Sequence, residues 1–275
     1  MTPTPLIRAF VCASFCGLAL LEVRSRDAAT FTPAIRAKIA AASPADQPLH
    51  TKWSESARHK AKVAAVKTGA YDLVLIGDSI TQCLEDGGEW KPLNKVWEKY
   101  YAPRKALNLG YSGQRTEDVL WRLDHGELDF ASSPRVFMLL IGTNNTDDQH
   151  YPTVHNAEQL VAGTKAILDR IKARHPTSKI LVLRVLPCGG PGDKTTYHRT
   201  YNRSEEMQAV LRDAHERMPA LADNQQVFYL DVNSVFLNPD GTVNPALMPD
   251  LIHPNADGAE AMAAAAARIH SARED

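Results

Sequence analysis

The chain is expected to fold as a single α/β domain built around one doubly wound sheet. Five short apolar runs alternate with amphipathic segments whose apolar residues recur at helical spacing. The runs are continuous, as in strands of a parallel sheet that helices cover on both faces. No internal repeat or interdomain linker interrupts this alternation, which favours one domain.

The expected strands end where the sequence carries residues that break regular structure. Gly77 and Gly142 follow the first and third apolar runs, and Pro187 follows the fourth. The strands are expected at residues 73–76, 106–110, 135–141, 179–186 and 227–232. The helices are expected at residues 53–68, 116–128, 156–174, 199–218 and 256–271.

The composition excludes several classes of protein. The 275 residues are 44% hydrophobic and 23% charged, and the formal net charge is −1. A disordered chain would carry fewer apolar residues, and a polytopic membrane protein would carry several long apolar runs. A net charge near zero gives no electrostatic reason to expect nucleic acid as a partner.

Residues 1–25 are expected to form a signal peptide, so the protein would be exported to the periplasm or secreted. The apolar run 9–21 follows Arg8 and is too short to span a bilayer comfortably, although no A-x-A cleavage site follows it. The alternatives are an N-terminal helix packed on the body and an uncleaved anchor. The uncleaved anchor would provide the only membrane contact.

The remaining chain divides into a lead-in and a domain. Residues 26–69 are expected to form a linker and a leading helix, and residues 70–275 the α/β domain. Cleavage of the leader would leave Cys83 and Cys188 as the remaining cysteines, whose spacing fits no zinc pattern. Two unbridged thiols are expected rather than a disulfide.

Polar residues suited to ester chemistry follow four of the five expected strands. Ser79 follows the first strand, Gly113 the second, Asn144 the third, and Asp250 and His253 the fifth. Ligands of open α/β sheets bind beyond the carboxyl ends of the strands. A hydroxyl nucleophile, a backbone donor, an amide donor and an Asp–His pair are the groups that ester cleavage requires.

Each of these residues also has an ordinary structural interpretation. Ser79 would serve as a helix N-cap, Asn144 and Gly113 as turn residues, and Asp250 with His253 as a surface turn. Only their joint occurrence on one side of a sheet favours an active site.

Other polar residues favour no site of their own. Residues His150 and His155 lack a third metal ligand at suitable spacing. A polar group that includes Arg203 is expected to be a solvated helix start rather than a site for a charged or sugar-like substrate. Its members are Tyr197, His198, Arg199 and Arg203.

The four blocks in this order resemble the SGNH hydrolase superfamily, also called the GDSL esterases and lipases. The blocks are GDSI at 77–80, NLGYSGQRTEDVLWRLDHGEL at 108–128, IGTNN at 141–145, and the Asp250–His253 pair. The second and third blocks are most similar to the platelet-activating-factor acetylhydrolase-like branch. The resemblance implies a three-layer α/β/α sandwich with a flavodoxin-like, five-stranded parallel sheet.

The same resemblance implies a role for each residue of the site. Ser79 would be the nucleophile, His253 the base and Asp250 the carboxylate that orients it. The oxyanion donors would be the Ser79 N–H, the Gly113 N–H and the Asn144 side chain. No metal or organic cofactor is implied.

The implied activity is a serine esterase acting on short-acyl esters through an acyl-enzyme. The substrate would be a small-molecule, polysaccharide or lipid ester. The alternatives are an acyltransferase that uses the same triad and a non-catalytic binding module on the same scaffold. The sequence does not indicate an oligomeric state.

Overall fold

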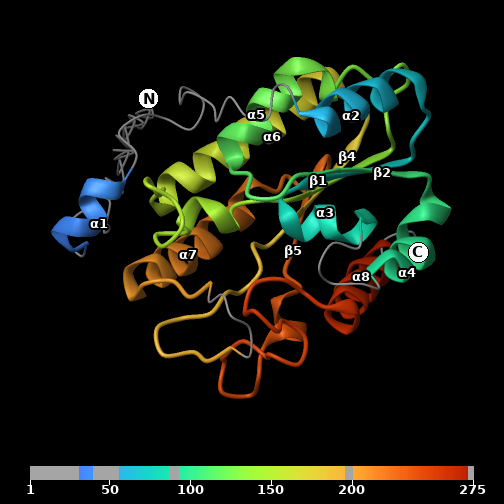
Figure 1. Ribbon diagram of the computed structural model, residues 1–275. Helices are drawn as coiled ribbons and strands as arrows, with labels where there is room; N and C mark the ends of the chain where they lie inside the picture. The colour runs from blue at the N-terminus through green and yellow to red at the C-terminus, as the bar shows by residue number, and fades with distance from the viewer. Residues whose placement is uncertain (1–30, 40–55, 87–92, 196–200, 272–275) are drawn as a thin grey trace, which may run out of the picture.

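A computed structural model describes residues 31–39, 56–86, 93–195 and 201–271. The described part of the chain forms a parallel sheet with helices on both faces (Figure 1). The expected signal peptide at 1–25 lies outside the described residues. No helix within the described ranges has the length and apolar character needed to cross a membrane.

The sheet has five parallel strands in the order β2-β1-β3-β4-β5, which confirms the predicted fold class. The strands are β1 Leu73–Gly77, β2 Ala106–Gly110, β3 Val136–Leu140, β4 Lys179–Leu183 and β5 Val227–Leu230. Leu73 pairs with Ala106 on one side and with Val136 on the other, so the central strands are in register. The fourth strand was predicted to reach residue 186, but β4 ends at Leu183. Leu183 pairs with Leu230, the last residue of β5, so no neighbouring strand extends the pairing on that side.

Eight α-helices lie in the described part of the chain. They are α1 Pro33–Lys38, α2 Ala57–Thr68, α3 Ser79–Asp86, α4 Leu93–Val96, α5 Thr116–Arg122, α6 Ala157–Arg174, α7 Glu205–Arg217 and α8 Ala256–Ser271. Short 3-10 or π segments are η3 Trp97–Tyr101, η4 Ala102–Arg104, η5 Leu123–Glu127, η6 Thr143–Thr146, η7 Met218–Leu221 and η8 Asn233–Phe236.

Side chains of each strand alternate between two apolar layers, because successive residues of a strand point to opposite faces. Val74 and Ile76 of β1 pack with α2, α5 and α6, whereas Leu75 packs with α3, α4 and α8. Figure 1 shows these two groups of helices on opposite sides of the sheet. The arrangement buries both faces, as the continuous apolar runs predict.

Serine and asparagine caps determine where several helices begin. The Ser204 side chain accepts a hydrogen bond from the Met207 N–H, so α7 begins at Glu205 and not at residue 199 as predicted. Asn156 and Gln159 exchange side-chain to backbone hydrogen bonds at the start of α6, forming a capping box.

The segment 31–39 packs on the body of the domain, although it falls in the expected linker. Phe31 and Ile35 are buried in an apolar cluster with α6 and α7. The Val154 N–H donates to the Lys38 carbonyl at 2.8 Å, and Ile39 forms a β-bridge with Val154. The N-terminal segment is therefore attached to the chain that follows η6.

Candidate active site

Ser79 begins α3 directly after β1, at the carboxyl edge of the sheet. A Cβ added to Gly77 would lie 2.6 Å from the Leu140 carbonyl oxygen, so the turn before Ser79 requires glycine. The buried Asp78 carboxylate accepts the Ile80 N–H at 3.0 Å and stabilises the first turn of the helix. Ser79 itself remains partly exposed.

His253 and Asp250 lie beside Ser79, although 174 positions of sequence separate the serine from the histidine. The distance from Ser79 Oγ to His253 Nε2 is 2.8 Å, and that from His253 Nδ1 to Asp250 Oδ2 is 2.6 Å. Asp250 Oδ1 also accepts the His253 N–H at 2.7 Å, which holds the turn closed. A carboxylate only accepts hydrogen bonds, so Nδ1 carries a proton and Nε2 of the neutral ring faces the hydroxyl as an acceptor.

The loop after β2 is attached to the turn that carries Ser79. The Tyr111 N–H donates to the Gly77 carbonyl at 3.1 Å, and the Ser112 N–H donates to Gln82 Oε1 of α3 at 2.7 Å. Gly113 follows with a φ of 73°, a left-handed conformation that favours glycine. The Tyr151 hydroxyl donates to the Gly113 carbonyl at 2.6 Å and fixes that peptide from the other side.

Asn144 lies in η6 after β3, and its side chain turns toward the same loop. Its Nδ2 donates to the Gln114 carbonyl at 2.8 Å, which leaves the second proton of the amide for another acceptor. The neighbouring Asn145 is buried and anchors the segment to α5, because its Oδ1 accepts the Thr116 N–H at 3.2 Å. The structure therefore brings all five residues predicted from the sequence to one edge of the sheet.

A buried ionic network lies behind the loop that follows β2 and carries Gly113, and sequence reasoning missed it. Arg122 and Glu127 form an ion pair, and both side chains are fully buried. Arg122 also donates to the Gln114 side chain and to the Leu109 carbonyl, at the two ends of the loop. Glu127 accepts a hydrogen bond from the Tyr111 hydroxyl at 2.5 Å. These charges fix the shape of the loop that carries Gly113.

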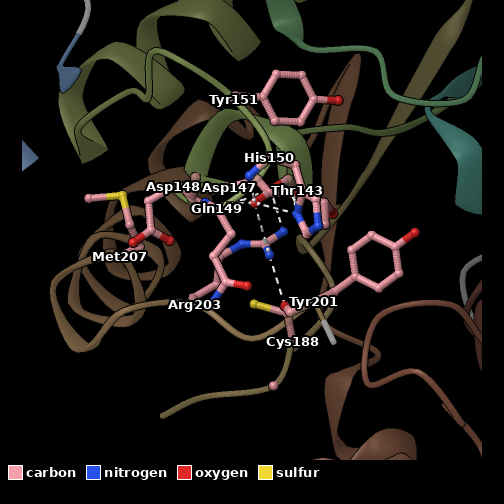
Figure 2. Close-up of polar contacts among 12 residues, drawn as sticks. Thr143, Asp147, Asp148, Gln149, His150, Tyr151, Cys188, Tyr201, Arg203 and Met207 are labelled. Carbon is pink, nitrogen blue, oxygen red and sulfur yellow. Dashed lines mark hydrogen bonds and ion pairs between the residues drawn. The ribbon is translucent and has the colours of Figure 1, made fainter. Parts of the chain in front are cut away.

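A second group of side chains, here called the rim cluster, consists of Asp147, His150, Tyr201 and Arg203 (Figure 2). Arg203 was expected on a solvated helix start, but its side chain is fully buried. It donates to the Tyr201 carbonyl at 2.8 Å and lies 3.6 Å from Asp147 Oδ1. The expectation was wrong because the guanidinium joins its own segment to the one that carries Thr143 and Asp147. Tyr197, His198 and Arg199 lie outside the described residues.

The loop after β4 supports the Asp–His turn. The Gly189 N–H donates to the Leu251 carbonyl at 2.9 Å. Leu251 has a φ of 67°, which is unusual for a side chain of this size and indicates a turn held by its surroundings. Cys188 is buried, burial raises the pKa of its thiol, and no disulfide joins it to Cys83.

Burial shifts the pKa values of two groups near the site. It raises the pKa of Asp78 to about 6, against the opposing effects of the Ile80 N–H and of His253. Burial, reinforced by the nearby Arg115 charge, lowers the pKa of His155 to about 3, so that imidazole is neutral. Within the described ranges, no group of three or more His, Cys, Asp or Glu side chains is placed to hold a metal ion.

Comparison with known proteins places this geometry in a family. Residues 75–261 match the model of the GDSL-like lipase/acylhydrolase family. The chain is 32% identical over 195 residues to the alpha1 subunit of human platelet-activating factor acetylhydrolase IB, covering 71% of this chain and 73% of that protein. The rat alpha2 subunit is 31% identical over 196 residues, covering 71% and 74%.

Solved structures share the fold at lower sequence identity. A GDSL-like lipase from Bacteroides thetaiotaomicron superposes with a TM-score of 0.61 at 17% identity, covering 78% of this chain and 97% of that one. An acetylxylan esterase from Geobacillus stearothermophilus has a TM-score of 0.52 at 20% identity, covering 74% and 94%. The family match spans more than half of the chain, and the chain belongs to the GDSL-like lipase/acylhydrolase family of carboxylic ester hydrolases.

Proposed function

We propose that the protein is a serine esterase that cleaves short-acyl esters through a triad of Ser79, His253 and Asp250. The observation that carries the proposal is the continuous pair of hydrogen bonds that runs from Ser79 Oγ through the His253 ring to Asp250. A serine hydroxyl is a weak nucleophile until a neighbouring base accepts its proton. His253 is within reach to do so, and Asp250 fixes the ring in the required tautomer.

The reaction follows from this arrangement. Ser79 Oγ attacks the ester carbonyl while His253 Nε2 takes the hydroxyl proton. The negative charge that forms on the carbonyl oxygen is stabilised by the Ser79 N–H, the Gly113 N–H and the second Asn144 amide proton. His253 then returns the proton to the departing alcohol. Water, activated by His253 in the same way, then attacks the carbonyl of the acyl-enzyme and releases the acid and free Ser79.

The preference for short acyl groups rests on the relatives. The chain is 32% identical to a protein named as an acetylhydrolase, and the similarity spans most of both chains. An acyl-enzyme can also pass its acyl group to an alcohol, so the same triad permits acyl transfer. Hydrolysis is the function we propose, and a sugar or glycerol acceptor added to the assay tests transfer directly.

A panel of p-nitrophenyl esters of increasing chain length tests the proposal. We expect the acetate to be cleaved fastest and Ser79→Ala to lower turnover by at least about 10³-fold. Ser132→Ala removes an exposed hydroxyl from another loop and should retain wild-type rates. Wild-type hydrolysis by Ser79→Ala would overturn the triad, and preferential cleavage of long chains would overturn the short-acyl assignment.

We also propose that residues 1–25 export the enzyme, on the basis of the apolar run and its charged flanks. Expression of the full chain with a C-terminal tag, followed by fractionation and N-terminal sequencing, tests this. A tagged protein that stays in the cytoplasm with its N-terminus uncleaved would contradict the assignment.

A further inference from the structure

The rim cluster contains a second aspartate-anchored imidazole next to the proposed triad. Asp147 Oδ1 accepts the Gln149 N–H at 3.1 Å and the His150 N–H at 3.0 Å, and Asp147 Oδ2 lies 3.0 Å from His150 Nδ1. Asp250 makes the same three contacts, with Ile252 N, His253 N and His253 Nδ1, at 3.1, 2.7 and 2.6 Å.

The Tyr201 ring lies between the two imidazoles. The centroid of the Tyr201 ring is 5.2 Å from the centroid of the His150 ring and 5.5 Å from that of the His253 ring. The Tyr201 and His253 rings meet edge to face. Figure 2 shows the His150 ring lying between the Asp147 carboxylate and the Tyr201 ring. His150 is thus one aromatic side chain away from the ring that protonates the departing alcohol. This places His150 on the leaving-group side of the site.

The cluster is built to hold His150 in one orientation. Asp147 is buried, and the fully buried Arg203 guanidinium lies against it while donating to the Tyr201 and Thr143 carbonyls. The same guanidinium therefore sets the positions of Asp147 and Tyr201. A buried charge held by several partners is costly to displace, so the His150 turn is preorganised.

The free edge of the His150 ring can only accept a hydrogen bond in the neutral form. Nδ1 donates its proton to the Asp147 carboxylate, so Nε2 presents a lone pair. The side chain is 43% exposed, and Nε2 has no hydrogen-bond partner among the residues that the structure describes. The group that this atom recognises must carry a proton donor, and a hydroxyl is the neutral donor that alcohol leaving groups contain.

We propose that His150 is a specificity-determining residue that accepts a hydrogen bond from a second hydroxyl of the leaving alcohol. The preferred substrates are then short-acyl esters of polyhydroxylated alcohols, such as O-acylated sugars, with the Tyr201 ring as an apolar wall beside the alcohol. This proposal rests on the serine esterase function proposed above, and it names the substrate class of that site.

Esters that share the acetyl group and differ in the alcohol test the proposal. Ethyl acetate carries no further hydroxyl, glycerol monoacetate carries two, and a mono-O-acetylated methyl glucoside presents a sugar. The wild type is expected to have a higher kcat/KM for both hydroxylated esters than for ethyl acetate. His150→Ala should lower kcat/KM for the hydroxylated esters by about fivefold to tenfold, mainly through KM, as expected for one lost hydrogen bond. Ethyl acetate hydrolysis should stay within twofold.

Three further variants control for structure. His150→Phe keeps a ring against Tyr201 but has no acceptor, so it should behave as His150→Ala does. His150→Gln retains an acceptor oxygen and should recover part of the preference. His125 of η5 carries another exposed imidazole, which stacks on Trp121 of α5, and His125→Ala should leave every ester unaffected.

The outcomes separate the two proposals. Equal losses on all three esters, or no loss on any, would overturn the role of His150 while Ser79-dependent hydrolysis stands. A loss of kcat/KM confined to the acetylated glucoside would show that His150 recognises a sugar. An equal loss on glycerol monoacetate would show that it recognises any alcohol with a vicinal hydroxyl, and both outcomes support the role. An absence of Ser79-dependent hydrolysis of every ester would instead overturn the proposed function.

Discussion

Replacing Glu127 by glutamine removes the charge that pairs with the buried Arg122 behind the loop that carries Gly113. Both side chains are fully buried, and Glu127 also accepts hydrogen bonds from Tyr111 and, at 2.9 Å, from His59. Removing one partner of a buried ion pair leaves an uncompensated charge and costs about 3–5 kcal/mol. We therefore expect Glu127→Gln to lower the free energy of unfolding by about that amount.

Urea denaturation at pH 7 measures the loss. With a slope of about 2 kcal/mol per M, a loss of about 4 kcal/mol moves the unfolding midpoint by about 2 M. Glu98→Gln changes an exposed glutamate of η3 and should leave the midpoint unchanged. A loss under about 1 kcal/mol for Glu127→Gln would refute the argument that this pair is fully desolvated.

The pH dependence provides an independent test of the same charge. Burial alone would raise the pKa of Glu127, but Arg122 and the hydrogen bonds from His59 and Tyr111 outweigh it and lower the pKa below its ordinary value of 4.5. A lowered carboxyl pKa contributes stability that is present above pH 4.5 and is lost as the pH falls through the folded-state value. Wild-type stability should fall over that acid range, and Glu127→Gln should show a shallower decline.

Three other substitutions test separate parts of the structure. Asn144→Ala removes one proposed oxyanion donor and should lower kcat by about 10²–10³-fold in the p-nitrophenyl acetate assay with little change in KM; a loss below threefold would contradict the role. Asp78 has a pKa raised to about 6 by burial, so its contribution to stability is present below pH 3.8 and lost as the pH rises through 6. Asp78→Asn should therefore gain stability relative to wild type as the pH rises from about 3 to about 7, by roughly 3 kcal/mol in total in urea unfolding, and a constant difference would contradict this. Ile35→Ala opens a cavity between the N-terminal segment and α6, and should cost about 2–4 kcal/mol, whereas the exposed Arg36 replaced by alanine should cost far less.

The sheet and the grouping of the candidate site residues were predictable because each depends on local signals. A continuous apolar run ending at Gly77 or Gly142 indicates both a buried strand and the place where it stops. The topology of a parallel sheet then brings the residues after each strand to one edge. Ser79, Asn144 and His253 could be grouped in this way without any knowledge of their separation in space.

The supporting residues were not predictable, because their burial depends on partners far away in the sequence. Arg122 and Glu127 sit on a segment with a regular amphipathic pattern, where charged side chains are normally exposed to solvent. Only the approach of the loop after β2 encloses them and supplies Gln114 and Tyr111 as partners. Charge alone therefore carries no signal that distinguishes a buried pair from a solvated one.

The rim cluster makes the same point for specificity. Asp147 and His150 are three residues apart, as are Asp250 and His253, and each pair forms the same hydrogen-bonded turn. The sequence spacing therefore indicates the local turn but not the role of its imidazole. What distinguishes the two turns is their surroundings: one imidazole faces the Ser79 hydroxyl and the other faces solvent. On the two proposals, an Asp–x–x–His turn with the same hydrogen bonds holds a general base in one place and a substrate-binding acceptor in the other. The chemistry of each imidazole is decided by the group that its Nε2 meets.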